Sequence, residues 1–183
     1  WLGPAPKRPF NPNRFHFNIR WFWDYAGGLM TDWGVHLINI MLWAMGPEHP
    51  KNVSSTGGKF VLDDNSETPD TQVTVYEFPN CTMIWEHKVG IGVGLNGRPW
   101  GISFSGNEGT LIVTDAGWEI LPEPKKKSLE ARKSAGSGDA RPAHVRNFLD
   151  CVKSRERPVE NLELGHHVSL VAHLGNIALR SGR

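Results

Sequence analysis

The sequence has 183 residues, which is long enough for one domain with a substantial apolar core. Its formal net charge of +1 gives no strong field that would favour nucleic acid or an anionic membrane as a partner, and no run of about eighteen apolar residues predicts a membrane span. Two isolated cysteines, Cys81 and Cys151, are too few for a disulfide framework and are typical of a reducing compartment, so we expect a cytoplasmic protein.

The chain opens with an irregular segment that leads into an apolar helix. Several prolines within residues 1–13 predict an extended loop, and residues 14–25 are dense in aromatic side chains without a clean period. A glycine pair follows, and residues 29–45 then have the composition of a largely buried helix, ended by a Gly-Pro pair. We expect irregular or partly extended backbone up to the glycines and one continuous helix after them.

Strands follow the helix, and two further helices close the chain. Alternating apolar residues between turn signals predict strands over 52–61, 70–78, 81–89, 99–106, 109–116 and 117–122. Residues 122–141 are polar and charged and predict an exposed loop, and helical patterns resume over 143–153 and 165–179. The expected fold class is α+β, an open and mainly antiparallel sheet with helices packed on one face. The other sheet face must then be covered or used for contact.

One glycine-rich stretch imitates a dinucleotide-binding motif. Residues 92–97 read G-x-G-x-x-G, a strand is predicted before them, and Asp115 follows eighteen residues after Gly97. That motif works only when a helix begins at the glycines, because the helix N-terminus holds the pyrophosphate. Here a proline, a tryptophan and another strand follow. We therefore interpret the stretch as a glycine-rich loop and expect no Rossmann unit in this sequence.

The apolar helix carries two chemically active side chains, Asp32 and His36, four residues apart and so on one face. Asn39 and Trp43 fall on the same stripe. A carboxylate beside an imidazole fixes its tautomer and produces a general acid or base. The alternative is structural: an aspartate that favours the start of a helix, together with a core histidine. A metal site would need a third ligand, and no candidate is convincing, so no metal is expected.

Three separated segments resemble the Gfo/Idh/MocA family of oxidoreductases. They are GGLMTDWGVH, which begins at Gly27 and resembles the family's G-G-x-x-x-D-x-G-x-H segment, then FSGNEGTLIV, and finally HVRNFLDCVKSRERPVENLELGHH. The resemblance implies a C-terminal α+β domain that in the family follows a Rossmann domain binding NAD or NADP. Residues 1–183 would form a single substrate-binding and oligomerisation domain, truncated at its N-terminus, which agrees with the missing initiator methionine.

The resemblance also implies roles for the residues of the helix. His36 would move a proton from a sugar hydroxyl while hydride leaves the same carbon, and Asp32 would orient His36 or bind a hydroxyl. The family's catalytic lysine lies in the Rossmann domain, so no residue here is assigned to it or to the cofactor. The family motif often has a second aspartate three residues after the histidine. Asn39 stands there in this sequence, and an amide can bind a hydroxyl but cannot act as a base.

Substrate contacts are expected from this helix and from the aromatic segment before it. Aromatic rings can stack on the C–H face of a pyranose, and polar side chains can bind its hydroxyls or a carboxylate. The alternative is that the aromatic residues are core, because alternate residues of a strand point inward. The candidates for substrate binding are His16, Arg20, Trp21, Trp23, Tyr25 and Asn39.

The implied function is the substrate-binding part of an NAD(P)-dependent oxidoreductase that acts on a sugar, polyol or glycoside. Two alternatives stay open: a redox-neutral glycoside hydrolase of the same family, which uses its nicotinamide transiently, and a non-catalytic association module. The NAD or NADP would be bound mainly by the absent domain, so this chain alone is expected to be inactive. We also expect a homo-oligomer formed through the open sheet face, because an apolar face is costly to leave in water.

Overall fold

The structure is a computed structural model that describes residues 2–46, 49–125, 128–136 and 138–182. The chain forms two compact units. The first contains residues 1–90 and 162–183, and the second contains residues 91–161. The prediction that residues 1–183 form a single substrate-binding and oligomerisation domain stays a prediction.

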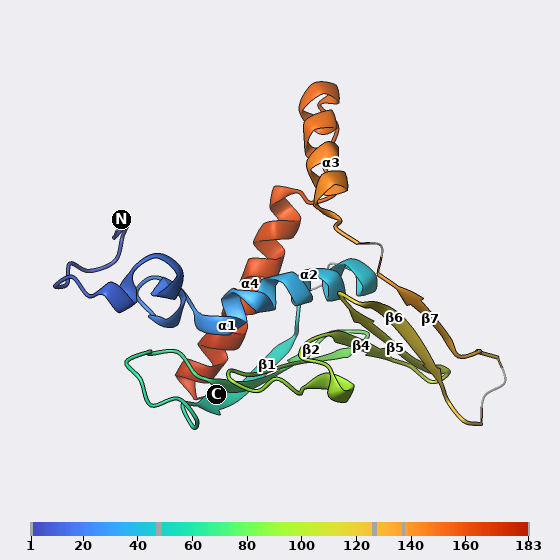
Figure 1. Cartoon of the computed structure of the whole chain (residues 1–183), viewed down its shortest axis with the longest axis horizontal. Coiled ribbons are helices and arrows are strands. Elements are labelled where there is room, and N and C mark those ends of the chain that lie inside the picture. Colours follow the sequence, from blue (N-terminus) through green and yellow to red (C-terminus); the bar gives the residue numbers. More distant parts are fainter. Residues whose placement is uncertain (1, 47–48, 126–127, 137, 183) are drawn as a thin grey trace. The chain divides into compact units, whose positions relative to one another are not determined.

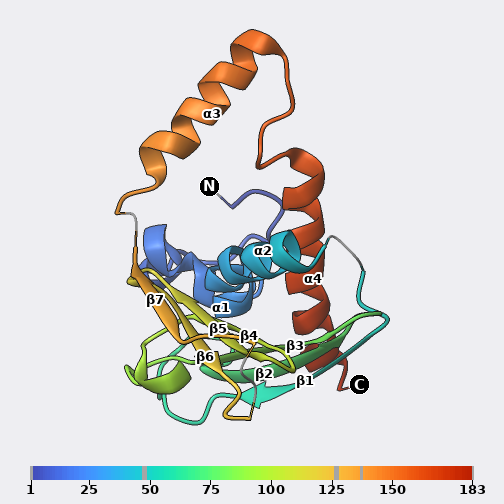
Figure 2. The same cartoon turned by 90° about the vertical axis from the view of Figure 1, so that its right-hand side faces the viewer.

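The first unit is a three-stranded sheet with helices on one face. Its elements are η1 (Pro12–Arg14), η2 (His16–Trp21), α1 (Gly28–Thr31), α2 (Trp33–Met45), β1 (Asn52–Gly58), β2 (Thr71–Glu77), β3 (Thr82–Lys88) and α4 (Leu162–Ser181). The strands are antiparallel in the order β1-β2-β3. Helices α1, α2 and α4 lie on the same side of this sheet (Figures 1 and 2). This unit therefore confirms the predicted α+β class.

The face of β2 that the helices cover is more polar than its sequence suggests. Gln72, Thr74 and Tyr76 are buried, whereas Val73 and Val75 point to the other face and stay half-buried. The helices supply the apolar side of this core, with Met30, Ile38, Leu42 and Val171 among its fully buried side chains. The tyrosine hydroxyl lies 3.6 Å from the Met30 sulfur. The valines that the alternating pattern presents thus lie on the face without helices.

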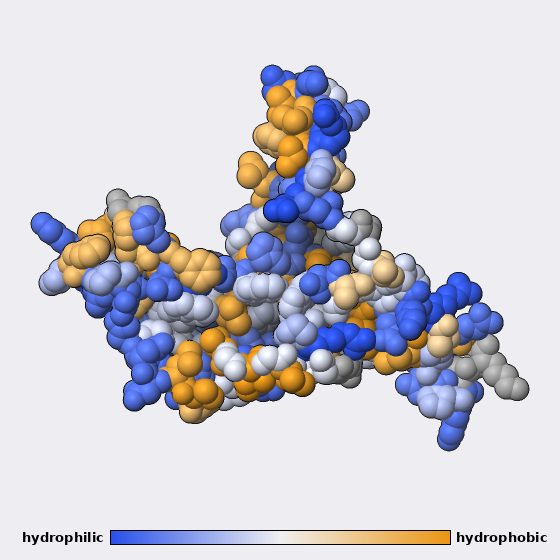
Figure 3. Space-filling view, viewed as in Figure 1, coloured by the Kyte–Doolittle hydropathy of each residue, from blue (hydrophilic) through white to orange (hydrophobic). Residues whose placement is uncertain are grey.

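The second unit is a four-stranded antiparallel sheet followed by a helix. Its elements are η3 (Leu95–Gly97), β4 (Ile102–Ser105), β5 (Gly109–Thr114), β6 (Gly117–Pro122), β7 (Arg132–Ala135) and α3 (Arg141–Ser154), with strand order β4-β5-β6-β7. None of the described residues of α3 is buried. Apolar side chains line one side of this helix (Figure 3), and they are Val145, Phe148, Leu149 and Val152.

Several predicted boundaries need correction. Residues 122–141 were predicted as an exposed loop; residues 126, 127 and 137 lie outside the described part of the chain. The described residues of this segment are mostly exposed but contain strand β7, which pairs with β6. Its four residues, RKSA, show no apolar alternation, so only backbone pairing defines it. Residues 14–25, expected to be irregular or partly extended, contain the 3-10 helix η2, and η1 ends at their first residue. The strands form two sheets, of three and four strands, where a single sheet was expected. No α-helix begins in the glycine-rich stretch 92–97, as predicted.

No helix within the described parts of the chain is long and apolar enough to cross a membrane.

A buried histidine makes the stability of the first unit sensitive to pH. The indole Nε1 of Trp85 donates to His87 Nδ1 at 3.0 Å, and His87 Nε2 lies 3.3 Å from the Pro69 carbonyl oxygen. This arrangement fits a neutral ring with its proton on Nε2. Burial lowers the pKa of His87 below its usual value of 6.5. As pH falls below 6.5, the unfolded chain therefore binds a proton at His87 more readily than the folded chain does.

We expect the free energy of unfolding to be highest above about pH 6.5 and to fall as pH decreases below it, by at most about 1.4 kcal/mol per pH unit from this group. Urea denaturation of the chain near neutral pH and near pH 5 measures the difference. His87→Gln should flatten the dependence, while the exposed His166→Gln should leave it unchanged. An equally steep dependence in His87→Gln would show that other groups cause it.

Candidate functional site

The predicted continuous helix is divided at Asp32. This residue has φ −96° and ψ −84°, so α1 ends before it and α2 begins after it. The start of α1 is fixed from outside the helix. Gly28 has φ +66°, and a Cβ atom there would lie 2.7 Å from Thr68 Cβ. The side chain of Asn176 on α4 donates to the Gly27 carbonyl oxygen at 2.8 Å. Packing against other segments thus sets where Asp32 lies.

The Asp32 carboxylate forms an ion pair with Arg20. Arg20 Nη1 bonds Asp32 Oδ2, and the two side chains are 24% and 28% exposed. The guanidinium is held on its other side by Phe17, because Nε donates to the Phe17 carbonyl oxygen at 3.0 Å and the ring centroid lies 3.7 Å away. A planar, permanently charged group clamped in this way fixes the carboxylate in one orientation.

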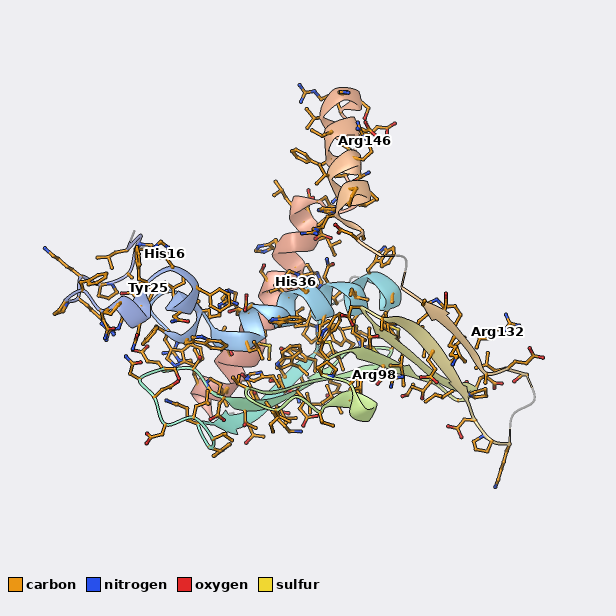
Figure 4. All side chains as sticks on the ribbon, in the orientation of Figure 1. His16, Tyr25, His36, Arg98, Arg132 and Arg146 are labelled. Atoms are coloured by element: carbon orange, nitrogen blue, oxygen red, sulfur yellow. The ribbon has the colours of Figure 1, made fainter. Side chains whose placement is uncertain are left out.

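His36 is exposed one turn further along. It lies about 200° around the helix axis from both Gly34 and Ile38, which are buried, so it points away from the core of the unit. Figure 4 shows His36 on α2. Within the described residues no hydrogen bond or ion pair joins Asp32 to His36, because the carboxylate is bound to Arg20. The expected orientation of His36 by Asp32 is therefore absent from this arrangement, and the reading of His36 as a core histidine is wrong.

Two exposed indoles flank the histidine. Trp33 is 42% exposed and Trp43 is 81% exposed, and both lie within about 60° of His36 around the helix axis. Asn39 is half-buried on the neighbouring stripe. Large apolar side chains gathered around a polar group on a surface are typical of a contact site. The sequence spacing predicted Trp43 on the same face as His36, but it did not predict that Trp33 is exposed.

The aromatic segment before α1 is partly committed to the fold. Trp23 donates from Nε1 to the Glu67 carbonyl oxygen at 3.0 Å, and Arg180 covers its ring at 4.8 Å. One face of Trp23 is thus occupied, which leaves less of it for a sugar. Trp21 and Tyr25 are half-buried, and the residue that points fully inward is Phe22. Trp21 and Tyr25 therefore keep surface for a ligand.

His16 begins η2 with a left-handed backbone, φ +49°, which is uncommon for a residue other than glycine. Its ring lies against Phe15, with 3.7 Å between centroids, and the residue is exposed. Figure 4 places His16 and Tyr25 in the segment that precedes α1. In the described parts of the chain no three His, Cys, Asp or Glu side chains are grouped so that they could hold a metal ion.

Comparisons with known proteins agree with this architecture. Residues 1–57 match a family model described as "Oxidoreductase family, C-terminal alpha/beta domain" of the Gfo/Idh/MocA group. The match includes the Gly27 to His36 segment, while the other two segments that carry the resemblance lie beyond it. No curated protein sequence matches the chain.

Solved structures share the fold. UDP-N-acetylglucosamine 3-dehydrogenase GnnA from Acidithiobacillus ferrooxidans superposes with a TM-score of 0.63 at 15% identity, over 94% of this chain and 51% of that one. An NAD-binding protein from Listeria innocua gives 0.64 at 24%, over 90% and 53%. The WlbA dehydrogenase from Bordetella pertussis, in complex with NADH and UDP-GlcNAcA, gives 0.58 at 15%, over 94% and 50%. The chain spans about half the length of each, and at these identities the likeness shows the fold.

Proposed function

We propose that this chain, of which residues 1–57 match a C-terminal-domain model of the Gfo/Idh/MocA oxidoreductases, is the substrate-binding part of an NAD(P)-dependent enzyme that oxidises a sugar, polyol or glycoside. One observation carries the proposal. His36 is exposed on α2, one turn after the ion-paired Asp32, within the segment that matches the family model. These residues offer an exposed imidazole, a fixed carboxylate and two exposed indoles. Such groups can bind a hydroxyl and remove its proton.

His36 acts as the general base in this proposal. It accepts the proton of the substrate hydroxyl as the carbon that carries the hydroxyl becomes a carbonyl. Asp32, held by Arg20, fills a fixed position one turn away and accepts a hydrogen bond from a neighbouring hydroxyl. A nicotinamide cofactor, when bound, supplies the hydride-acceptor chemistry. The glycine-rich stretch 92–97 ends in η3 and is followed by β4, so it lacks the helix N-terminus that would hold the pyrophosphate of the cofactor.

The full-length protein should accumulate reduced nicotinamide when it is given NAD⁺ or NADP⁺ and a panel of sugars, polyols and glycosides. Absorbance of the reduced cofactor measures this directly. Release of an aglycone without net accumulation of reduced cofactor would instead identify a redox-neutral glycosidase. Turnover of none of these compounds would contradict the proposal and leave the association module as the reading of this chain.

The sheet face without helices should make the protein self-associate. Ile84 is 66% exposed there and pairs across the sheet with Val75, and Val73 lies on the same face of β2. An apolar row on an open sheet face is stabilised when a second copy covers it. We expect light scattering to give the mass of a dimer or larger assembly. Ile84→Lys should shift this mass toward the monomer, whereas Ile177→Lys, at an exposed position of α4, should not. A monomeric mass for the unchanged protein would contradict the prediction.

A further inference from the structure

The arginines around the candidate site are unequally paired with acids. Arg8 binds Asp24 at 2.6 Å and Glu67 at 3.4 Å, and Arg20 binds Asp32. Arg14 forms no ion pair and no side-chain hydrogen bond with any described residue. The segment that precedes α2 therefore holds one guanidinium whose charge has no counter-charge within the described chain.

The structure nevertheless holds Arg14 in place. Its guanidinium lies over the ring of Phe22 at 5.5 Å from the centroid, and Phe22 is only 2% exposed. Nε of Arg14 is buried and has no acceptor, although the residue as a whole is only half-buried. A donor buried without an acceptor is unfavourable, and partial desolvation of an unpaired charge adds to this cost. Proteins accept such a cost more readily where a ligand removes it.

Packed elements connect Arg14 with the ion pair of the site. Its helix η1 packs against η2, which carries Arg20, and η2 packs against α1, which ends one residue before Asp32. The fork of Arg20 is already occupied by Asp32 and by the Phe17 carbonyl oxygen. Two nitrogens of Arg20 thus already make hydrogen bonds, whereas the side chain of Arg14 makes none with the described residues.

We propose that the substrate carries an anionic group, a carboxylate or a phosphate, and that Arg14 binds this group. The proposal rests on the proposed function, because it names the class of sugar that the same site takes. A guanidinium presents donors in a planar fork that matches either oxyanion. Arg14 would then be a specificity-determining residue, which sets the preference for acidic over neutral sugars without touching the carbon that is oxidised.

Calorimetric titration of the full-length protein with glucuronate, glucose 6-phosphate and glucose tests the proposal. We expect at least one anionic sugar to bind about tenfold more tightly than glucose, and the tighter of the two anions identifies the oxyanion. Arg14→Gln should remove this preference, and Arg14→Lys, which keeps the charge, should retain part of it. Arg146→Gln, an exposed arginine of α3, is the matched control and should change nothing.

The outcomes distinguish a failure of the Arg14 assignment from a failure of the proposed sugar site. Equal binding of all three sugars, or an unchanged preference for the anionic sugar in Arg14→Gln, would overturn the assignment of Arg14 while leaving a sugar site in place. Binding of none of the three would overturn both the anionic class and the proposed sugar site.

Discussion

Replacement of His36 by alanine in the full-length protein is expected to lower kcat about a hundredfold or more, which is the usual scale for the loss of a general acid or base. The side chain is exposed and makes no hydrogen bond to the described residues, so its removal should leave the fold and its stability nearly unchanged. Substrate is bound by other side chains, so KM should change less than kcat. Steady-state formation of reduced nicotinamide measures both constants.

His166→Ala provides the control for this variant. His166 is also an exposed helical histidine, but it lies on α4 outside the proposed site, so kcat should stay within about twofold of the unchanged protein. Near-normal turnover of His36→Ala would remove this residue from the mechanism.

Elements could be predicted from the sequence wherever a local pattern specifies them. The glycine pair, the apolar run and the Gly-Pro stop predict a helix over residues 29–45, which covers α1 and α2 but misses the break at Asp32. Hairpin signals place β2 and β3 within one or two residues of their observed limits. Strand β7 was not predicted because it lies at the sheet edge and lacks an alternating apolar pattern. Only its hydrogen bonds to β6 define it. Whether strands join one sheet or two depends on pairing between distant segments, which periodicity does not encode.

Spacing alone predicts Asp32 and His36 on one face of a continuous helix, but it indicated neither the break at Asp32 nor the partner of its carboxylate. Arg20 is twelve residues away and reaches the carboxylate only because η2 packs on α1. The sequence offered His36 as the nearer partner. Similarly, Asn176 sits within an apolar helix and bonds Gly27 across 149 residues of chain. A polar residue inside an apolar helical pattern was the one available sign that something buried had to be satisfied there.

The valines of β2 show that an alternating pattern can identify a strand without showing which of its faces packs against the helices. Val73 and Val75 alternate with polar residues, and the usual reading turns apolar residues toward the core. In the structure the polar residues Gln72 and Thr74 face the helices, where Ser55 Oγ lies within 3.1 Å of the Gln72 amide and 2.7 Å of the Thr74 hydroxyl. The valines are left for the open face. This inversion is physically reasonable if a second copy covers that face, as the light-scattering experiment tests.

A large loss of stability is expected from Gly28→Ala. The backbone has φ +66° at this position, which costs an L-residue about 1–2 kcal/mol. The new Cβ would also lie 2.7 Å from Thr68 Cβ, and Thr68 is buried, so one segment has to move at a further cost of about 1–3 kcal/mol. We therefore expect the free energy of unfolding, measured by urea denaturation of the chain, to fall by about 3 kcal/mol.

Gly90→Ala separates the two contributions. Gly90 has φ +86° in the turn after β3, and an added Cβ would meet nothing within 4 Å, so this variant should lose only the backbone part, about 1 kcal/mol. Equal losses in the two variants would mean that Thr68 gives way without cost and that the start of α1 is not fixed by this contact. If Gly28→Ala loses more, the helix start has shifted against Thr68, and Asp32, four residues later, shifts with it. The same substitution should then lower kcat of the full-length protein at temperatures where the variant is still folded, because the carboxylate next to His36 no longer occupies the position that Arg20 and the glycine turn define.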